Sequence, residues 1–247
     1  MRPAPILAIT FDLDDTLWAI DPVIARAEEL MHAWLAEHYP LLPQRYTPAA
    51  LRALRDGIVT ARPELAHDLS ALRRESLLLA ATECGYGPEA AEGAFAVMWQ
   101  ARNEVELFTD VLPVLGALAG RYALGGLTNG NADIARIGLD SVLRFCVTAR
   151  EVGFAKPHPA IFAAACTATG IAPHQVLHVG DDPERDVHGA RAAGMRTVWV
   201  NRDARPWPGG APADAEVCDL HGLLGLLDGD TAWPDAAGSP ADPPTYL

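Results

Sequence analysis

The 247-residue sequence is poor in cysteine and in positive charge. Its four cysteines include no CxxC pair, which argues against a zinc site or a disulfide scaffold and favours a reducing compartment. The sequence has 19 Lys and Arg but 32 Asp and Glu. The resulting net charge of −13 argues against nucleic acid or an anionic membrane as the main partner. The sequence has no signal-peptide pattern and no apolar run of the ~18 residues that a membrane span needs. We therefore expect a soluble, cytoplasmic protein.

What remains is an ordinary globular composition, 50% hydrophobic and 21% charged, without internal repeats. The length suits one large domain, or a core domain with an insert. No feature of the composition indicates an oligomeric state.

Residues 18–110 have helical periodicity almost throughout. Asp21-Pro22 and Thr47-Pro48 each combine an N-cap residue with proline at the first helical position, and Gly85 is a natural helix end. Four predicted helices with short connections indicate a small antiparallel helical unit.

The rest of the chain alternates between strands and helices. The short, β-branched run at residues 6–11 predicts a strand that is buried on both faces. Further strands are predicted at residues 122–127, 145–148, 176–179 and 197–200, and helices at 112–120, 133–143, 160–169, 184–193 and 220–227. This alternation predicts a parallel α/β sheet built from residues 1–17 and 111–228, with residues 18–110 inserted into it. Residues 202–215 are predicted to form an irregular loop, and residues 229–247 a disordered tail.

Three carboxylates, Asp12, Asp14 and Asp15, directly follow the first predicted strand. Such a cluster repels itself, a cost that a cation or a phosphoryl group would offset. Taken alone, the segment also fits an acidic turn in which Asp15 and Thr16 cap a helix.

Other predicted strands and loops also end in polar residues of complementary type. These are Thr128 and Asn129, then Lys156, then Asp181, Asp182 and Asp186. Because parallel strands place their carboxyl ends at one edge of the sheet, we expect these groups to converge with Asp12 and Asp14. Carboxylates suit Mg²⁺, whereas Lys156 and Thr128 suit a phosphoryl group.

These segments resemble, in order, the four signature motifs of the haloacid dehalogenase-like phosphohydrolases. The segment DLDDT at 12–16 matches DxDxT, and LTN at 127–129, KP at 156–157 and GDDPERD at 180–186 look like the second, third and fourth motifs. The resemblance implies a Rossmann-like parallel sheet core with an inserted all-helical cap of the C1 type.

The resemblance also implies a role for each matching residue. Asp12 would be the nucleophile that forms an aspartyl-phosphate, and Asp14 the general acid and base. Lys156 would balance charge at the phosphoryl group. Substrate-binding residues would be Thr16, Thr128 and Asn129, and the residues at the Mg²⁺ site Asp12, Asp14 (through its carbonyl), Asp181, Asp182 and Asp186.

Within this family the aspartate at position 14 favours phosphate ester hydrolysis over dehalogenation. A narrower similarity, to bacterial phosphatases, points to 5-amino-6-(5-phospho-D-ribitylamino)uracil or flavin mononucleotide (FMN) as the small phosphorylated metabolite. A phosphotransferase of the same family and a non-catalytic binding protein are the alternatives.

Several polar residues are interpreted as structural. His178, in a strand among apolar neighbours, is predicted to be a satisfied core histidine. Asn131 is predicted to cap the helix that follows it. Three arginines of the helical insert are predicted to be solvated surface, although they could reach the substrate: Arg62, Arg73 and Arg74.

Overall fold

The computed structural model describes residues 5–229, and it is built on a six-stranded, all-parallel sheet. The strands are β1 (Ala8–Phe11), β2 (Ala123–Thr128), β3 (Phe145–Thr148), β4 (Val176–Gly180), β5 (Arg196–Val200) and β6 (Ala215–Val217). Their order is β3-β2-β1-β4-β5-β6, so β1 lies in the middle between β2 and β4. This order confirms the predicted parallel α/β core.

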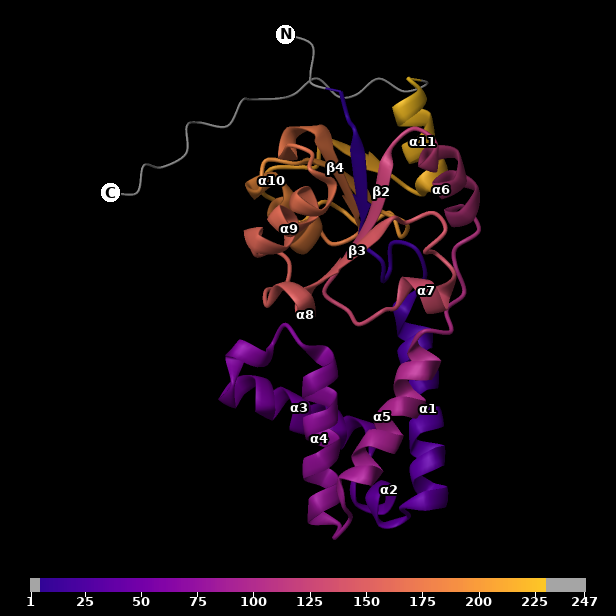
Figure 1. The fold of residues 1–247 in the computed structure, drawn as a ribbon, viewed down its shortest axis with the longest axis vertical. Coiled ribbons are helices and arrows are strands. Elements are labelled where there is room, and N and C mark those ends of the chain that lie inside the picture. Colours follow the sequence, from indigo (N-terminus) through magenta and orange to yellow (C-terminus); the bar gives the residue numbers. More distant parts are fainter. Residues whose placement is uncertain (1–4, 230–247) are drawn as a thin grey trace, which may run out of the picture.

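Helices cover both faces of the sheet (Figure 1). They are α6 (Val111–Ala119), α7 (Ile134–Ile137), α8 (Ala149–Val152), α9 (Pro159–Thr169), α10 (Gly189–Ala192) and α11 (Leu220–Asp228), with a π-helical turn at Pro183–His188. Ile9 and Phe11 of β1 pack with α6 and α11 on one face, whereas Ala8 packs with α9 and α10 on the other. β1 is therefore buried on both sides, as its apolar run predicts.

The chain between β1 and β2 forms a second body, which we call the helical unit (Ile20–Arg102). It contains α1 (Ile20–His38), α2 (Leu41–Arg45), α3 (Pro48–Ala61), a 3₁₀ turn (Pro63–Leu65), α4 (Leu69–Glu83) and α5 (Pro88–Arg102). Thr47 and Asp68 cap α3 and α4 by accepting the backbone N–H of Ala50 and Ala71. Its core is separate from that of the sheet and includes Leu35 and Phe95. Figure 1 shows the unit at one end of the sheet, with α1 and α5 side by side at the connection.

Three details differ from the sequence-based prediction. The insert contains a fifth helix, α2, because Leu42 packs into the core of the helical unit. The helix predicted at 133–143 is only α7, because Gly138 adopts a left-handed φ of 83° and ends it. The loop predicted at 202–215 ends in β6, which pairs with β5 at the edge of the sheet.

The predicted tail lies outside the described residues except for Gly229, the C-cap of α11. Among residues 5–229, no helix combines the length and the hydropathy that crossing a membrane requires.

Candidate active site

The residues that follow the three central strands, β2, β1 and β4, lie close together at the carboxyl edge of the sheet. Phe11 pairs with Gly126 of β2 and with Val179 of β4, so the segments after these strands begin side by side. The N–H of Asp12 continues the ladder by donating to the carbonyl of Val179 at 2.8 Å. Asp12, Thr128 and Asp181 therefore meet at the carboxyl edge of the sheet, as the sequence predicts.

Beyond Asp12 the chain makes a tight turn. The N–H of Leu17 donates to the carbonyl of Leu13, and the N–H of Asp15 to that of Trp18. Asp15 has a positive φ of 61°, and its Oδ1 accepts the N–H of Ile20 at the start of α1. The interpretation of Asp15 as a capping residue is confirmed, while Asp12 and Asp14 carry the other two carboxylates of the turn.

Lys156 occupies the centre of the site and is 4% exposed. It lies in the loop between α8 and α9, and its Nζ contacts Asp12 Oδ1 at 2.5 Å and Asp186 Oδ1 at 2.7 Å. Burial alone would lower the pKa of Lys156, but the charges of Asp12 and Asp186 outweigh it and hold the pKa above its usual value. The amine therefore stays protonated.

Asp186 is held from three sides. Besides Lys156, His178 Nε2 lies 3.2 Å from Oδ1, and the N–H of Asp182 donates to Oδ2 at 3.0 Å. Burial would raise the pKa of Asp186, but Lys156 and His178 together hold it below the usual range. His178 is a satisfied buried histidine, as predicted, since Thr10 Oγ1 contacts its Nδ1 at 2.9 Å. Its other partner is a carboxylate of the site.

Three carboxylates, two of them buried and that of Asp181 partly buried, lie around the ammonium group of Lys156. Asp12, Asp181 and Asp186 each offer an oxygen, and these oxygens lie within 4.8 Å of one another. Burial raises the pKa of Asp181 to about 7, with a further contribution from Asp186, and burial also raises the pKa of Asp12. Lys156 and Arg205, whose Nη2 lies 3.5 Å from Asp181 Oδ2, do not balance three carboxylates, and an oxygen-only donor set fits Mg²⁺. Both oxygens of Asp186 accept hydrogen bonds of 3.0 Å or less, whereas those that Asp181 accepts from Thr16 and Arg205 are longer, at 3.3 and 3.5 Å. Asp12 and Asp181 are therefore the carboxylates that better fit direct coordination.

Two residues from the predicted site have other partners. Asp182 Oδ1 accepts the N–H groups of Glu184 and Arg185, both at 2.9 Å, so Asp182 caps the following turn and lies outside the carboxylate cluster. Thr16 is fully buried and donates from Oγ1 to Asp181 Oδ1 at 3.3 Å. Thr16 therefore orients a carboxylate, and its hydroxyl does not face a substrate.

The residues directly after β2 line another side of the site. Thr128 Oγ1 accepts the N–H of Gly130 at 2.8 Å. Asn129 accepts the N–H of Lys156 at 2.6 Å and donates to its carbonyl at 2.9 Å. The side chain of Asn129 is thus committed to the backbone of Lys156, which it positions.

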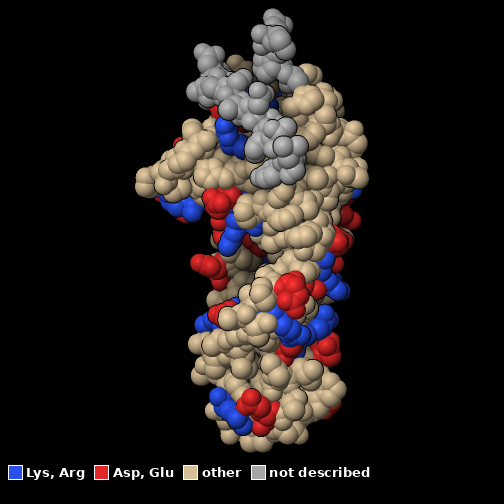
Figure 2. All heavy atoms as spheres, turned by 90° about the vertical axis from the view of Figure 1, so that its left-hand side faces the viewer, with Lys and Arg blue, Asp and Glu red and all other residues tan. Residues whose placement is uncertain are grey.

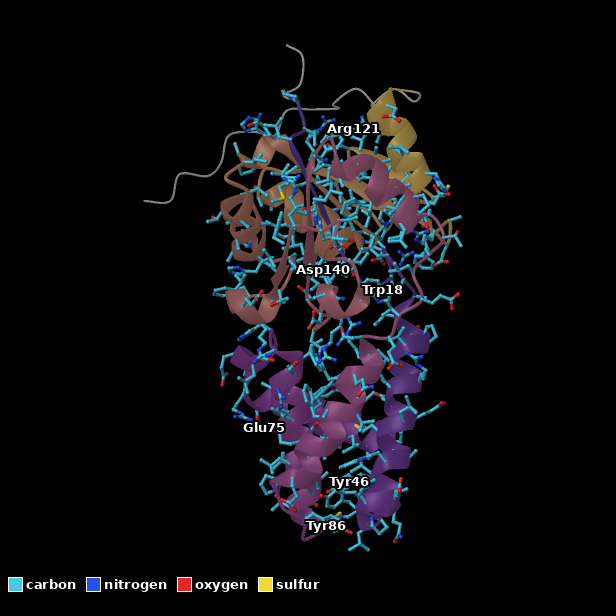
Figure 3. The ribbon with its side chains drawn as sticks, turned by 45° about the vertical axis from the view of Figure 1, so that its right-hand side comes forward. Trp18, Tyr46, Glu75, Tyr86, Arg121 and Asp140 are labelled. Atoms are coloured by element: carbon cyan, nitrogen blue, oxygen red, sulfur yellow. The ribbon has the colours of Figure 1, made fainter. Side chains whose placement is uncertain are left out.

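Asp14 contacts a residue that the sequence-based prediction missed. Arg102, the last residue of α5, donates from Nη2 to both carboxylate oxygens of Asp14 at 2.7 Å. Trp18 Nε1 donates to Asp14 Oδ1 at 2.9 Å, and Figure 3 labels Trp18 where the core meets the first turn of α1. A Cβ added at Gly130 would lie 2.6 Å from Asp14 Oδ2 and 3.1 Å from Thr128 Oγ1, so Asp14 points at the same side of the site.

Asn131 extends this contact into the helical unit. Its Oδ1 accepts from Arg102 Nε at 3.0 Å, and its Nδ2 donates to Ser70 Oγ at 3.1 Å. The prediction that Asn131 caps α7 is wrong, because Asp133 takes that position and accepts the N–H of Ala135. The one sequence signal for Arg102 was its place at the end of the helical insert.

A cleft of about 530 Å³ opens beside these residues, between the core and the helical unit. Its lining includes His67, Ser70 and Trp99 from the helical unit and Asn131, Asp133 and Arg150 from the core. Figure 2 shows the surface hollowed at this junction, with acidic and basic side chains around the hollow. A small charged molecule can therefore enter between the two bodies as far as Gly130 and Asn131, next to Asp14.

Comparison with known proteins places this arrangement in a family. Residues 6–194 match the family model described as haloacid dehalogenase-like hydrolase. The chain is 32% identical over 232 residues to the 5-amino-6-(5-phospho-D-ribitylamino)uracil phosphatase YigB of Escherichia coli, covering 90% of this chain and 96% of that protein. It is 36% identical to the phosphoserine phosphatase of Thermus thermophilus over 81% of this chain and 82% of that one.

A solved structure is similar over nearly the whole chain. A crystal structure described as 2-haloacid dehalogenase from Pseudomonas syringae superposes with a TM-score of 0.87 at 37% identity, covering 92% of this chain and all of that one. The relatives thus include enzymes of two chemistries, phosphate ester hydrolysis and dehalogenation.

Proposed function

The chain belongs to the haloacid dehalogenase-like hydrolases, and we propose that it is a Mg²⁺-dependent phosphatase of small phosphorylated metabolites that works through an aspartyl-phosphate. The observation that carries the proposal is the pairing of two unlike carboxylates at the end of β1. Asp12 contacts a buried ammonium group, and Asp14 contacts a guanidinium and an indole. Two carboxylates in different environments are suited to different tasks.

The first task is attack on phosphorus. Lys156, itself held by Asp186, holds one oxygen of Asp12 in place, and Asn129 fixes the backbone of Lys156. A positioned carboxylate attacks phosphorus to form the acyl phosphate while Lys156 offsets the charge of the phosphoryl group. A Mg²⁺ ion at Asp12 and Asp181 would supply further neutralisation of that charge.

The second task is proton transfer. Asp14 lies beside Gly130 and Thr128, and we place the leaving oxygen of a substrate attacked by Asp12 on this side of the site. As the bond from Asp12 to phosphorus forms and the ester P–O bond breaks, Asp14 donates a proton to the leaving oxygen, and it then accepts one from the water that hydrolyses the acyl phosphate. Trp18 and Arg102 hold its carboxylate in the required direction.

Asp14 also favours a phosphatase over the second candidate, a 2-haloacid dehalogenase. The similarity to the Pseudomonas syringae structure supports that candidate. Displacing halide from carbon requires no proton donor, whereas an alkoxide leaving group does. A dehalogenase would release chloride from 2-chloropropionate, and we expect none.

The direct experiment measures phosphate release from 4-nitrophenyl phosphate. Wild-type protein should be active with Mg²⁺ and inactive after chelation, and Asp12→Asn should be inactive in both conditions. Asp15→Asn is the matched control in the same turn, because asparagine tolerates the positive φ of that position. Activity of Asp12→Asn, or undiminished activity in chelator, would refute the proposal.

Further features remain proposals of the same kind. Product analysis with an acceptor sugar separates the phosphatase from a phosphotransferase, and Mg²⁺ binding without turnover would indicate a non-catalytic binding protein. The narrower expectation of 5-amino-6-(5-phospho-D-ribitylamino)uracil or FMN as substrate is tested by including both in a panel of phosphorylated metabolites. The four free cysteines fit the proposed cytoplasmic location.

A further inference from the structure

Arg73 on α4 is a cation without an anionic partner. Among residues 5–229 it forms no ion pair with a carboxylate, whereas its neighbour Arg74 pairs with Glu92. Its Nη1 donates to Met98 Sδ at 3.1 Å, a weak acceptor, and its Nε is buried without a partner. The prediction that Arg73 is a solvated surface residue holds only in part, because the side chain is half-buried and its Nε is fully buried.

Arg102 shares this feature. It is 2% exposed, and two of its nitrogens are bonded to Asp14 and Asn131. The third, Nη1, is buried and has no partner among the described residues. Two guanidinium groups of the helical unit thus each keep a buried N–H unsatisfied, although burying such donors is costly.

The two arginines lie on facing sides of neighbouring helices. Ser70 and Arg73 are three residues apart on α4, and Met98 and Arg102 are four apart on α5, so each pair shares a face. Asn131 bonds to both Ser70 and Arg102, which directs these faces toward the active site. Arg73 contacts Met98, and one helical turn, about 5.4 Å, separates Met98 from Arg102. Arg73 is therefore farther from Asp14 than Arg102 is.

Neighbouring charges leave this region with a positive surplus. Arg73 borders a small pocket with Arg52, Arg55 and Glu28, and Glu28 already pairs with Arg52. Burial, together with the charge of Arg55, lowers the pKa of Arg73 to about 10. The charges of Glu28 and Asp14 offset only part of this cost, because the pKa of Arg73 stays lowered and its Nε has no partner, which is typical of a site that binds an anion.

We propose that Arg73 and Arg102 form a subsite for a second anionic group of the substrate, a carboxylate or a second phosphate, which projects from the phosphoryl group into the helical unit. This inference rests on the proposed phosphatase function and narrows its substrate class. It disfavours FMN and the ribitylaminouracil phosphate, whose far ends carry neither group.

Pairs of substrates that differ only by one anionic group measure the contribution of that group to kcat/KM. Phosphoserine and phosphoethanolamine differ by one carboxylate, and fructose 1,6-bisphosphate and fructose 6-phosphate differ by one phosphate. In wild type, the ratio of kcat/KM within at least one pair should favour the member with the second anion by about 10-fold or more, the range of a hydrogen bond to a buried charge. The pair that shows this preference identifies the group.

The variant that tests the subsite is Arg73→Gln, with Arg74→Gln as the matched control on the same helix. Arg73→Gln should reduce the ratio to near 1, Arg73→Lys should retain part of it, and Arg74→Gln should leave it unchanged. Arg73→Gln should also keep or raise the midpoint of thermal unfolding without substrate, because it removes a half-buried charge that forms no ion pair among the described residues. A purely structural arginine would instead lower the midpoint.

Each outcome is decisive. A wild type that hydrolyses FMN or the shorter member of each pair as well as the doubly anionic compounds overturns the subsite. So does a ratio that survives in Arg73→Gln. If not even 4-nitrophenyl phosphate is hydrolysed with Mg²⁺, the phosphatase proposal itself fails, which is a different result.

Discussion

Arg102 Nη2 donates to both carboxylate oxygens of Asp14 at 2.7 Å, and this contact joins the last residue of the helical unit to the first loop of the core. In this position of the helical unit, Arg102 and Trp18 orient the Asp14 carboxylate. If Asp14 is the proton donor that we propose, its orientation depends on where the helical unit lies, since Arg102 belongs to that unit.

We predict that Arg102→Gln slows substrates with poor leaving groups most. Glycerol 3-phosphate needs a proton donor to release its alkoxide, whereas 4-nitrophenolate leaves unprotonated. The kcat/KM for glycerol 3-phosphate should therefore fall about 10- to 100-fold more than that for 4-nitrophenyl phosphate, the cost of a misplaced catalytic group. Arg121→Gln is the control, since Arg121 pairs with Asp228 far from the site (Figure 3). Equal losses on both substrates would show that Arg102 does not orient the proton donor.

The adjacent pair Asp181 and Asp182 gives a second prediction. Asp181 belongs to the carboxylate cluster, whereas Asp182 caps a turn through the N–H groups of Glu184 and Arg185. Asp181→Asn should raise the Mg²⁺ concentration for half-maximal activity at least about 10-fold. Asp182→Asn should leave it nearly unchanged, because asparagine caps as well as aspartate does. A metal dependence that shifts more in Asp182→Asn than in Asp181→Asn contradicts the assignment.

Much of this site could be predicted because local sequence patterns determine the strands and the residues that follow them. The parallel sheet follows from short β-branched runs that alternate with helices, and parallel strands bring Asp12, Thr128 and Asp181 to one edge without further information. Lys156 was predictable from its Lys-Pro pair, although the short helix α8 separates it from β3.

The remaining partners depend on how two bodies pack, which local patterns do not encode. Asn131 was predicted to cap a helix because it precedes one, yet Arg102 and Ser70 from the helical unit bind it. Arg73 and Arg102 look like any surface arginine in a helix, and only the folded structure shows that Arg102 is buried and Arg73 half-buried. The residues of the sheet edge were therefore predictable, whereas those contributed by the helical unit were not.

Thiol reactivity gives a third prediction. Burial raises the pKa of the Cys146 thiol to about 12, with a smaller contribution from Glu151, whereas Cys218 is exposed. Because only the thiolate is alkylated, iodoacetamide at pH 8 should modify Cys218 and leave Cys146 unreacted in the folded protein. Mass spectrometry of the digested protein measures both sites, and protein alkylated in denaturant supplies the reference. Modification of Cys146 at the same rate as Cys218 would contradict this prediction and would show that the Cys146 thiol in β3 is accessible to the reagent.

The pKa of Asp181 predicts how the stability of the metal-free protein depends on pH. Burial and the nearby Asp186 raise it to about 7, from 3.8 when unfolded. Between these values the folded protein binds a proton that the unfolded chain does not, so stability falls as pH rises, by up to about 1.4 kcal/mol per pH unit. The raised pKa of Asp12 acts in the same direction. The lowered pKa of Asp186 contributes stability that is lost only below about pH 4, outside this window.

Protein treated with chelator should therefore unfold at a lower temperature at pH 8 than at pH 5.5, and Mg²⁺ should restore stability at pH 8 because it binds only the folded carboxylate cluster. Asp181→Asn serves as the control, since it removes the titrating group and should show a shallower decline with pH and a weaker response to Mg²⁺. The two midpoints of thermal unfolding at each pH, with and without Mg²⁺, measure the effect. If the midpoint of thermal unfolding falls with the same slope in wild type and in Asp181→Asn, other groups set the pH dependence. In that case the ionised carboxylate of Asp181 does not destabilise the metal-free protein.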